Sequence, residues 1–211
     1  MQKRLFIALD MPTAPRAELA RLCTGLPGAR WTPENQMHLT LCFLGETEGS
    51  AFLDLREALA DIRAQAFSLG LRGLGFFPPR GTPRVLWAGI EANPALLHLQ
   101  ARVLACVRRL GLPLEQRKFL PHITLARLSE ASLPKLQGYL STYALFSVPA
   151  FPMQSFCLYS SLLGRAGATH LVEAEYELGP ACSATDPDRN KKSGLRTNTK
   201  TAESAGGDER N

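Results

Sequence analysis

Two tetrapeptides with the same pattern decide how this chain is interpreted: His38-Leu39-Thr40-Leu41 and His122-Ile123-Thr124-Leu125. They lie 84 positions apart in a chain of 211 residues that has only four histidines. In each tetrapeptide an aliphatic residue separates His from Thr, and this alternation is typical of a half-buried β-strand. We therefore expect two similar strands, each with His and Thr on one face. Such a pair of histidines provides the groups needed for acid–base chemistry without a metal ion.

The rest of the chain indicates alternating strands and helices of an α+β fold. The expected bounds of these strands and helices follow from the apolar periodicity, from charged or polar ends, and from the positions of prolines and glycines. The expected strands are residues 4–9, 37–44, 67–74, 85–90, 122–128, 144–148, 153–161 and 170–178, and the expected helices are residues 14–23, 50–65, 94–110 and 133–142. Residues 76–83, with three prolines, are expected to form a loop. Because each His–Thr strand is followed by a helix, we expect one domain, residues 1–180, with two lobes and one motif in each.

Residues 181–211 differ in character from the rest. They have no aromatic residue and a single large aliphatic one, Leu195, among charged and small polar residues. Such a segment cannot bury enough apolar surface to offset the entropy of ordering. We expect a disordered polar tail.

Composition narrows the class of protein and its location. Apolar residues make up 45% of the chain, and no apolar run is long enough to cross a membrane. The charged and then apolar N-terminal segment could be mistaken for a signal peptide. Its apolar stretch is only five residues long, however, and Asp10 and Pro12 follow it. Five cysteines without a CxxC spacing indicate neither a disulfide framework nor a zinc site. We expect a soluble, cytoplasmic protein; its net charge of +5 suits a polyanionic partner such as RNA but does not by itself identify one.

Longer stretches around the two motifs resemble the 2H phosphoesterases, and among them the RNA 2′,3′-cyclic phosphodiesterases once called 2′-5′ RNA ligases. The resemblance covers nearly all of residues 1–178. It rests on the segments 4–9 (RLFIAL), 37–45 (MHLTLCFLG), 83–89 (PRVLWAG) and 119–127 (FLPHITLAR). One His-x-Thr occurs by chance, whereas two copies with these flanks, in this order, are specific. The family often has Tyr where this chain has His170, which we interpret as a change in lining or packing without catalytic meaning.

The resemblance implies a bilobal, pseudo-symmetric fold in which two antiparallel sheets line a central cleft, with helices outside. It also implies hydrolysis of RNA 2′,3′-cyclic phosphate ends to 2′-phosphates, with His38 as proton donor and His122 as proton acceptor. Thr40 and Thr124 share the faces of these histidines and are expected to hydrogen-bond to the phosphate. No cofactor or metal is expected, since two histidines without nearby acidic or cysteine ligands make a poor zinc site.

Two further residues are carried over from the family. Arg127 matches an arginine five positions after the second His, and we expect it to bind phosphate. Strict alternation places it on the face opposite His122, so that a strand end or a bulge must turn it inward. Phe6 is expected either to stack on a base or to lie in the core, and we assign Trp31, Phe43 and Trp87 to the core.

Alternative functions stay open at this point. One is a phosphodiesterase or ligase for 2′-5′ linked oligonucleotides that uses the same residues. Another is a module that binds RNA ends without catalysis. The expected partner is RNA with a 2′,3′-cyclic phosphate end, tRNA fragments among the candidates, and the expected state is a monomer.

Overall fold

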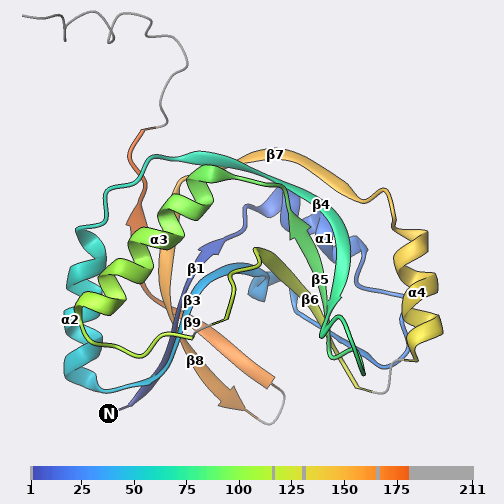
Figure 1. Ribbon diagram of the computed structural model, residues 1–211, viewed down its shortest axis with the longest axis horizontal. Helices are drawn as coiled ribbons and strands as arrows, with labels where there is room; N and C mark the ends of the chain where they lie inside the picture. The colour runs from blue at the N-terminus through green and yellow to red at the C-terminus, as the bar shows by residue number, and fades with distance from the viewer. Residues whose placement is uncertain (1, 116, 130–131, 165–166, 181–211) are drawn as a thin grey trace, which may run out of the picture. The chain divides into compact units, whose positions relative to one another are not determined.

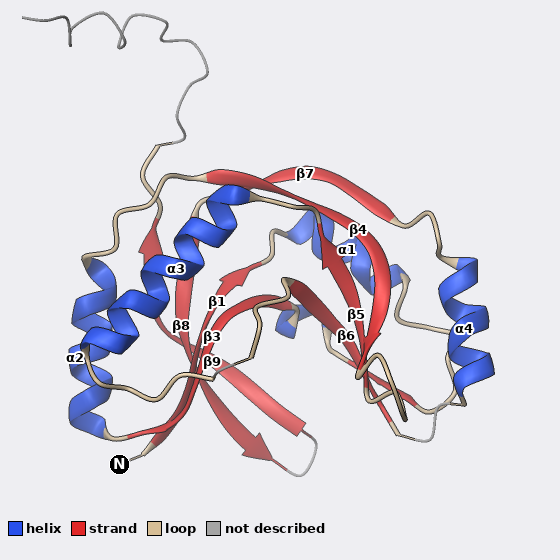
Figure 2. Cartoon of the chain, in the orientation of Figure 1, coloured by secondary structure: helices blue, strands red, loops and turns tan. Residues whose placement is uncertain are grey.

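The computed structural model describes residues 2–115, 117–129, 132–164 and 167–180. Within them nine strands, all paired antiparallel, form one open sheet (Figures 1 and 2). The strands are β1 (Lys3–Asp10), β2 (Ala29–Trp31), β3 (His38–Thr47), β4 (Phe67–Phe77), β5 (Val85–Ile90), β6 (His122–Leu128), β7 (Ser147–Met153), β8 (Ser155–Gly164) and β9 (Gly167–Glu177). Their order is β7-β4-β5-β6-β3-β1-β8-β9, and β2 pairs with β6 outside this path. The predicted tail, residues 181–211, lies outside the described residues.

The two motif strands, β3 and β6, are neighbours at the centre of the sheet. They are joined by a single residue pair, Leu39 opposite Ile123. Each of these residues directly follows a motif histidine, so an approximate two-fold axis at this pair exchanges the two motifs. The two sheets expected from the sequence are therefore the halves of one sheet, with β1, β3, β8 and β9 on one side of the pair and β4 to β7 on the other.

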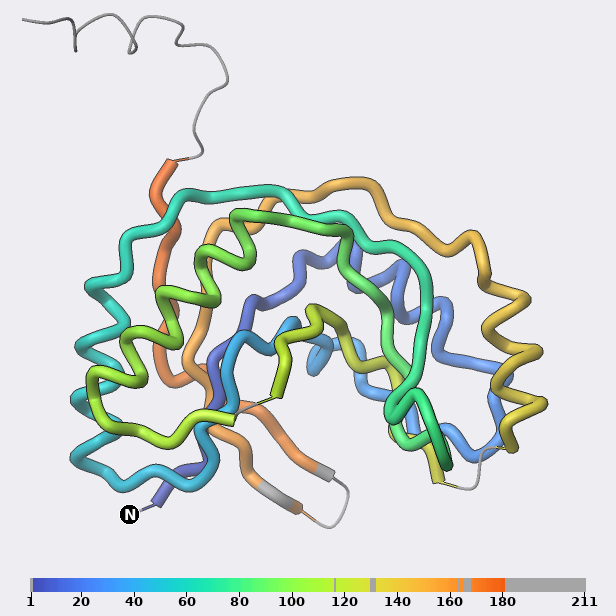
Figure 3. The backbone as a smooth tube through the Cα atoms, viewed as in Figure 1, coloured from blue at the N-terminus to red at the C-terminus, as the bar shows by residue number. Residues whose placement is uncertain are grey.

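Distant parts of the chain form each half (Figure 3). Strand β1 lies between β3 and β8, and its Leu5 is opposite Ser160. On the other side β5 lies between β4 and β6. Both motif strands thus have a central position in the sheet, each with a partner strand on its outer edge.

Four helices contribute buried side chains to the core on one face of the sheet. They are α1 (Thr13–Arg21), α2 (Gly49–Ala60), α3 (Pro94–Arg109) and α4 (Leu133–Thr142), and a 3₁₀ turn, η1, spans Glu34–Gln36. Helix α3 shows why the local sequence folds this way: Asn93 accepts a hydrogen bond from the Leu96 backbone N–H at 2.9 Å, and Pro94 occupies the first turn. None of the helices in the described ranges has both the length and the apolarity that a membrane crossing needs.

The sheet has two chemically different faces. One face carries the alternating aliphatic residues of the motifs, Leu39, Leu41, Ile123 and Leu125, in a single core cluster to which all four helices contribute. The other face carries the motif histidines and threonines. A small separate cluster of Phe6, Ala8, Cys157 and Tyr159 lies on that side, which we call the histidine face.

Several elements differ from the sequence-based expectation. Strand β7 spans Ser147–Met153 rather than 144–148, because the chain after α4 first forms a turn in which the Phe146 N–H donates to the Tyr143 carbonyl oxygen at 3.0 Å, and helix α2 ends at Ala60 rather than at 65. Strand β2 and the turn η1 were not predicted, because three residues are too few to show a periodic pattern. Strand β4 continues to Phe77 into the expected loop, since Phe76 and Phe77 pair with Leu86 and Val85 of β5. The predicted ranges 85–90, 122–128 and 133–142 agree with β5, β6 and α4.

The central pair yields a test of the fold. Replacing Leu39 by Ala removes a fully buried side chain where the two halves meet, and we expect the free energy of unfolding to fall by about 2–5 kcal/mol. The matched control is Leu97→Ala on α3, a residue that is 51% exposed, for which the expected loss is about 0.5 kcal/mol. Urea denaturation followed by circular dichroism measures both values. Equal losses in the two variants would contradict the central role of the pair.

Candidate active site

The two motif strands present the same series of side chains to the same two faces. In both, the aliphatic residues after His and after Thr are at most 2% exposed, whereas His38, Thr40, His122 and Thr124 are partly exposed. The burial sequence of the first seven residues of β3 is identical to that of β6. The predicted arrangement of His and Thr on one face of each strand is therefore confirmed.

Both histidine rings are held in the same way by the backbone. Nδ1 of His38 lies 2.8 Å from the carbonyl oxygen of Gln36, and Nδ1 of His122 lies 2.7 Å from the carbonyl oxygen of Leu120. A carbonyl oxygen only accepts, so Nδ1 must carry the proton and donate it in each case. In the neutral ring this leaves Nε2 with a free lone pair. Each histidine is thus fixed in the tautomer that can accept a proton at Nε2, or release one from there after protonation.

Aromatic side chains shield both rings from water. The ring of His38 lies 4.9 Å from that of Phe6 and 6.0 Å from that of Tyr159, measured between centroids. The ring of His122 lies 5.0 Å from Phe77 and 6.2 Å from Trp87. Equivalent histidines in the two halves are therefore both packed against aromatic residues.

This shielding lowers the pKa of both histidines. Burial is the main cause at His38, and with the positive charges of His170 and His122 it lowers the pKa from 6.5 to about 4, against the opposing hydrogen bond to Gln36. Burial also lowers the pKa of His122, and the positive charge of Arg127 adds to the effect. Each of these histidines directly precedes a residue of the Leu39–Ile123 pair, which brings the two motif histidines close to each other on adjacent strands. Both imidazoles are neutral at pH 7 in the free protein.

A β-bulge turns Arg127 onto the histidine face. Thr124 is opposite Trp87 and Ala126 is opposite Leu86, so β6 has one extra residue, Leu125, between these two pairs. The extra residue reverses the alternation that follows it, and Arg127 returns to the face of His122. The sequence required either a strand end or a bulge for this, and the structure shows a bulge.

Strand β2 supports this bulge. The backbone N–H of Thr32 donates to the carbonyl oxygen of Leu125 at 2.8 Å, and Arg30 is opposite Arg127 in the β2–β6 pairing. The carbonyl of the bulged residue thus has a hydrogen-bond partner on the edge of β6 that faces β2. An unpredicted strand of three residues therefore helps to position a predicted site residue.

The first motif has an equivalent bulge. Ile7 is opposite Cys42 and Ala8 is opposite Thr40, so Leu41 is the extra residue in β3. Phe43 consequently occupies the position in β3 that Arg127 occupies in β6. It is 53% exposed, which corrects its assignment to the core. The motif copies therefore differ here, with an exposed aromatic ring in one and a guanidinium in the other.

Phe6 lies in the site but is covered. Its ring stacks on Tyr159, with centroids 5.0 Å apart and planes 7° apart, and also contacts His38. Only 3% of the residue is exposed. This leaves no free ring face for a base, so the expectation of a base platform does not fit the observed packing. Phe43, whose ring centroid lies 5.9 Å from that of Phe6, offers the exposed aromatic surface instead.

Trp87 was also assigned to the core, and the structure places it beside His122. It is opposite Thr124, on the histidine face, and its indole nitrogen is buried without a hydrogen-bond partner among the described residues. Gly75 makes room for it, because a Cβ atom there would lie 2.3 Å from the indole ring. Trp31, in contrast, packs against the main core as predicted.

His170 lies beside His38. It is opposite Ser161 in the β8–β9 hairpin, and its ring is perpendicular to that of His38, with centroids 5.3 Å apart. The expectation of a lining residue agrees with this position. Its neighbours come from other strands, and no signal in the local sequence indicates them.

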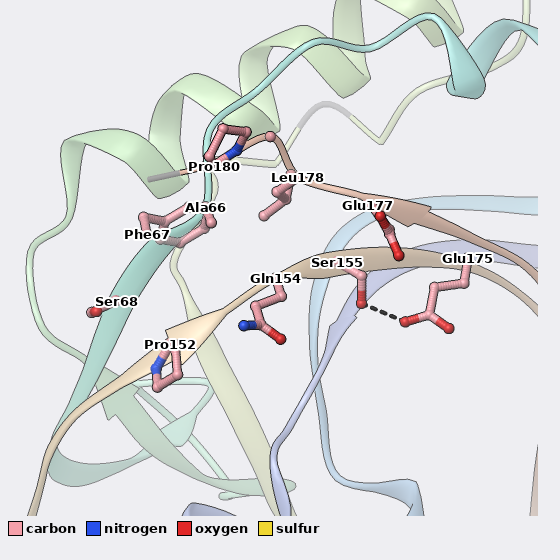
Figure 4. A pocket seen from close by; sticks show the side chains of 11 residues that line it. Ala66, Phe67, Ser68, Pro152, Gln154, Ser155, Glu175, Glu177, Leu178 and Pro180 are labelled. Carbon is pink, nitrogen blue, oxygen red and sulfur yellow. Dashed lines mark hydrogen bonds between the residues drawn. The ribbon is translucent and has the colours of Figure 1, made fainter. Parts of the chain in front are cut away.

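Other groups in the protein do not match this chemistry. No three or more His, Cys, Asp or Glu side chains within the described ranges are arranged to hold a metal ion. A surface hollow of about 500 Å³ lies elsewhere, bordered by Gln154, Ser155, Glu175 and Glu177 among others (Figure 4). Glu175 there accepts a hydrogen bond from Ser155 at 2.6 Å. Carboxylates repel a phosphate, so the histidine face is the candidate active site.

Comparison with known proteins was made on sequence and on structure. The chain matches the family described as LigT like Phosphoesterase over residues 9–87 and 90–170. It is 36% identical over 187 residues to the RNA 2′,3′-cyclic phosphodiesterase of Thermus thermophilus, covering 83% of this chain and 90% of that protein. The same-named protein of Aeropyrum pernix is 35% identical over 162 residues, 76% of this chain and 90% of the relative. For that of Geobacillus stearothermophilus the identity is 34% over 154 residues, 68% of this chain but about half, 49%, of the relative.

Solved structures agree with the sequence comparison. The crystal structure of the Thermus thermophilus protein TT0787 superposes with a TM-score of 0.70 at 33% identity, covering 84% of this chain and 98% of the other. The structure of Escherichia coli LigT in apo form gives a TM-score of 0.68 at 27% identity, with 84% and 98% covered. The repeated motif, the sheet and these matches lead to one conclusion: the chain belongs to the family of LigT-like phosphoesterases.

Proposed function

We propose that this protein hydrolyses RNA 2′,3′-cyclic phosphate ends to 2′-phosphomonoesters, using His38 and His122 as acid and base. The observation that carries the proposal is the matched pair of imidazoles, each with Nδ1–H donated to a backbone carbonyl and Nε2 left for catalysis. The relatives named RNA 2′,3′-cyclic phosphodiesterase support it. So do the structures of Escherichia coli LigT with 3′-AMP and with phosphate.

The reaction needs one proton removed and one supplied. In the proposed mechanism Nε2 of His122 takes a proton from water as the water oxygen attacks phosphorus. The bond between phosphorus and the 3′ oxygen breaks, and Nε2–H of protonated His38 gives its proton to that oxygen. The phosphate stays on the 2′ oxygen, and a proton moved from His122 to His38 restores the enzyme.

Neighbouring residues stabilise the charge that develops on the phosphoryl oxygens. The hydroxyl groups of Thr40 and Thr124 lie on the same face as the two histidines, two residues after each, and can donate hydrogen bonds. Arg127 adds a charge-assisted contact, for which the bulge at Leu125 provides the direction. These three assignments follow the residues predicted from the sequence.

The pH dependence of kcat/KM tests the acid–base assignment. Both histidines have a pKa lowered from 6.5 in the free protein, that of His38 to about 4. The active form needs His38 protonated and His122 neutral, so we expect a bell with both breaks below pH 6.5. Above the breaks, kcat/KM falls as pH rises, because His38 loses the proton that it donates. A maximum at or above pH 7, or a flat profile, would contradict the mechanism.

Substitution of the histidines tests their roles directly. His38→Asn and His122→Asn each remove a proton-transfer group while keeping a polar side chain, and kcat should fall by about 10²–10⁴-fold. The matched control is His98→Asn, since His98 is exposed on α3 and bonds only to Arg102 among the described residues. Turnover is measured on an RNA that ends in a 2′,3′-cyclic phosphate, with chromatographic separation of 2′- and 3′-phosphate products. Full activity in either site variant would remove that residue from the mechanism.

Arg127 can be tested both by kinetics and without turnover. Arg127→Gln removes a phosphate contact, and we expect KM to rise about tenfold or more. It also removes the positive charge that lowers the pKa of His122, so this pKa should rise in an NMR titration of the free protein. Arg108→Gln, at an exposed position at the end of α3, is the control. An unchanged pKa of His122 would show that Arg127 does not act near it.

The alternatives make different predictions on the same substrates. A 2′-5′ phosphodiesterase or ligase would act on 2′-5′ linked dinucleotides in preference to cyclic phosphates. A non-catalytic RNA-end-binding module would turn over no cyclic phosphate and would keep its RNA affinity in the His38→Ala and His122→Ala variants. The monomeric state, the cytoplasmic location and tRNA fragments as substrates stay predictions.

A further inference from the structure

A third histidine lies in the candidate active site. His170 in β9 is opposite Ser161 of β8, and the hairpin that contains it continues from the pairing of β8 with β1. Its ring is edge-on to two site residues: the centroid distance to His38 is 5.3 Å with the planes at 89°, and the distance to Phe6 is 4.9 Å with the planes at 77°. His170 is therefore in direct contact with the proposed proton donor.

The hydrogen bonding of His170 differs from that of the motif histidines. Its Nδ1 atom is buried and has no hydrogen-bond partner among the described residues, whereas Nδ1 of His38 and Nδ1 of His122 each donate to a carbonyl. A buried N–H without a partner is rarer in proteins than an unpaired acceptor. The neutral ring of His170 is thus expected to keep its single proton on Nε2. Burial lowers its pKa from 6.5, so the neutral form dominates above that pH.

This tautomer gives the ring a different role from that of its neighbour. Nε2 of neutral His38 has a lone pair, whereas Nε2 of His170 has a proton to donate. Because Nε2 of neutral His170 already carries a proton, this nitrogen cannot take the proton that His38 needs for the leaving oxygen. Nε2–H can only donate, and the non-bridging oxygens of a phosphate are strong acceptors.

We propose that His170 is a substrate-binding residue that donates a hydrogen bond from Nε2–H to a non-bridging oxygen of the phosphate bound beside His38. This inference rests on the proposed function, because the phosphate is the group on which His38 acts. No hydrogen bond within the described residues occupies Nε2 of His170, which leaves it for the ligand. The resulting contact stabilises the bound phosphate without changing the path of either proton.

Two substitutions that differ by one oxygen atom test the proposal. His170→Phe keeps an aromatic ring against His38 and Phe6 but removes the donor, whereas His170→Tyr keeps both a ring and a donor at its far end. At pH 7, where His170 is neutral, we expect KM for the cyclic-phosphate RNA and the inhibition constant of inorganic phosphate to rise about tenfold in His170→Phe, the loss of one hydrogen bond to a charged group. In His170→Tyr both constants should stay within about threefold of the wild-type values.

The measurements separate this role from packing and from failure of the proposed function. If both variants behave like the wild type, or if both are impaired equally, the ring matters only for packing and the proposal is wrong. Melting temperatures of both variants show whether they fold. NMR of the imidazole ring in the wild-type protein reports the tautomer independently of turnover, and a proton on Nδ1 of neutral His170 would also overturn the proposal. A wild-type protein that binds phosphate through His170 but turns over no cyclic phosphate would instead refute the proposed function alone.

Discussion

The contact between Leu39 and Ile123 sets the geometry of the whole site. It is the one residue pair through which β3 and β6 are joined, and it directly follows both motif histidines. Because the backbones of two adjacent strands set the separation between the histidines, no loop has to order before the two rings can act together. Both side chains of the pair are fully buried, so the hydrophobic core on one face holds the motif histidines in place on the other.

The bulges in β3 and β6 determine which residues after the motifs lie on the histidine face. An uninterrupted strand would show His and Thr on the open face and would turn the residue five positions after His into the core. The extra residue that directly follows the motif threonine, Leu41 in β3 and Leu125 in β6, reverses that alternation and exposes Phe43 and Arg127. Next to β6, the short strand β2 pairs with the segment that follows the bulge, and the backbone N–H of Thr32 donates to the carbonyl oxygen of the bulged residue.

Much of this architecture can be predicted from the sequence, and the rest depends on contacts between distant strands. The alternation in the motifs predicts that His and Thr share a face. Pro83 and Pro134 lie near the starts of β5 and α4, whose predicted bounds agree with the structure. The pattern does not show where a bulge lies, because Leu125 and Ala126 are both apolar and suit either arrangement. Phe43 and Trp87 are apolar too, so composition assigns them to the core, whereas the pairing of their strands turns them to the open face. The contact of His170 with His38 joins β9 to β3, and no local pattern reports such a contact.

The near two-fold relation of the motifs has a consequence for regiochemistry. A 2′,3′-cyclic phosphate presents two ester oxygens in almost mirror-related positions, and two equivalent imidazoles alone would have no preference between them. The choice of which P–O bond breaks must therefore come from the residues that break the symmetry of the protein. These are Arg127 in place of Phe43 on one side, and His170 beside His38 on the other.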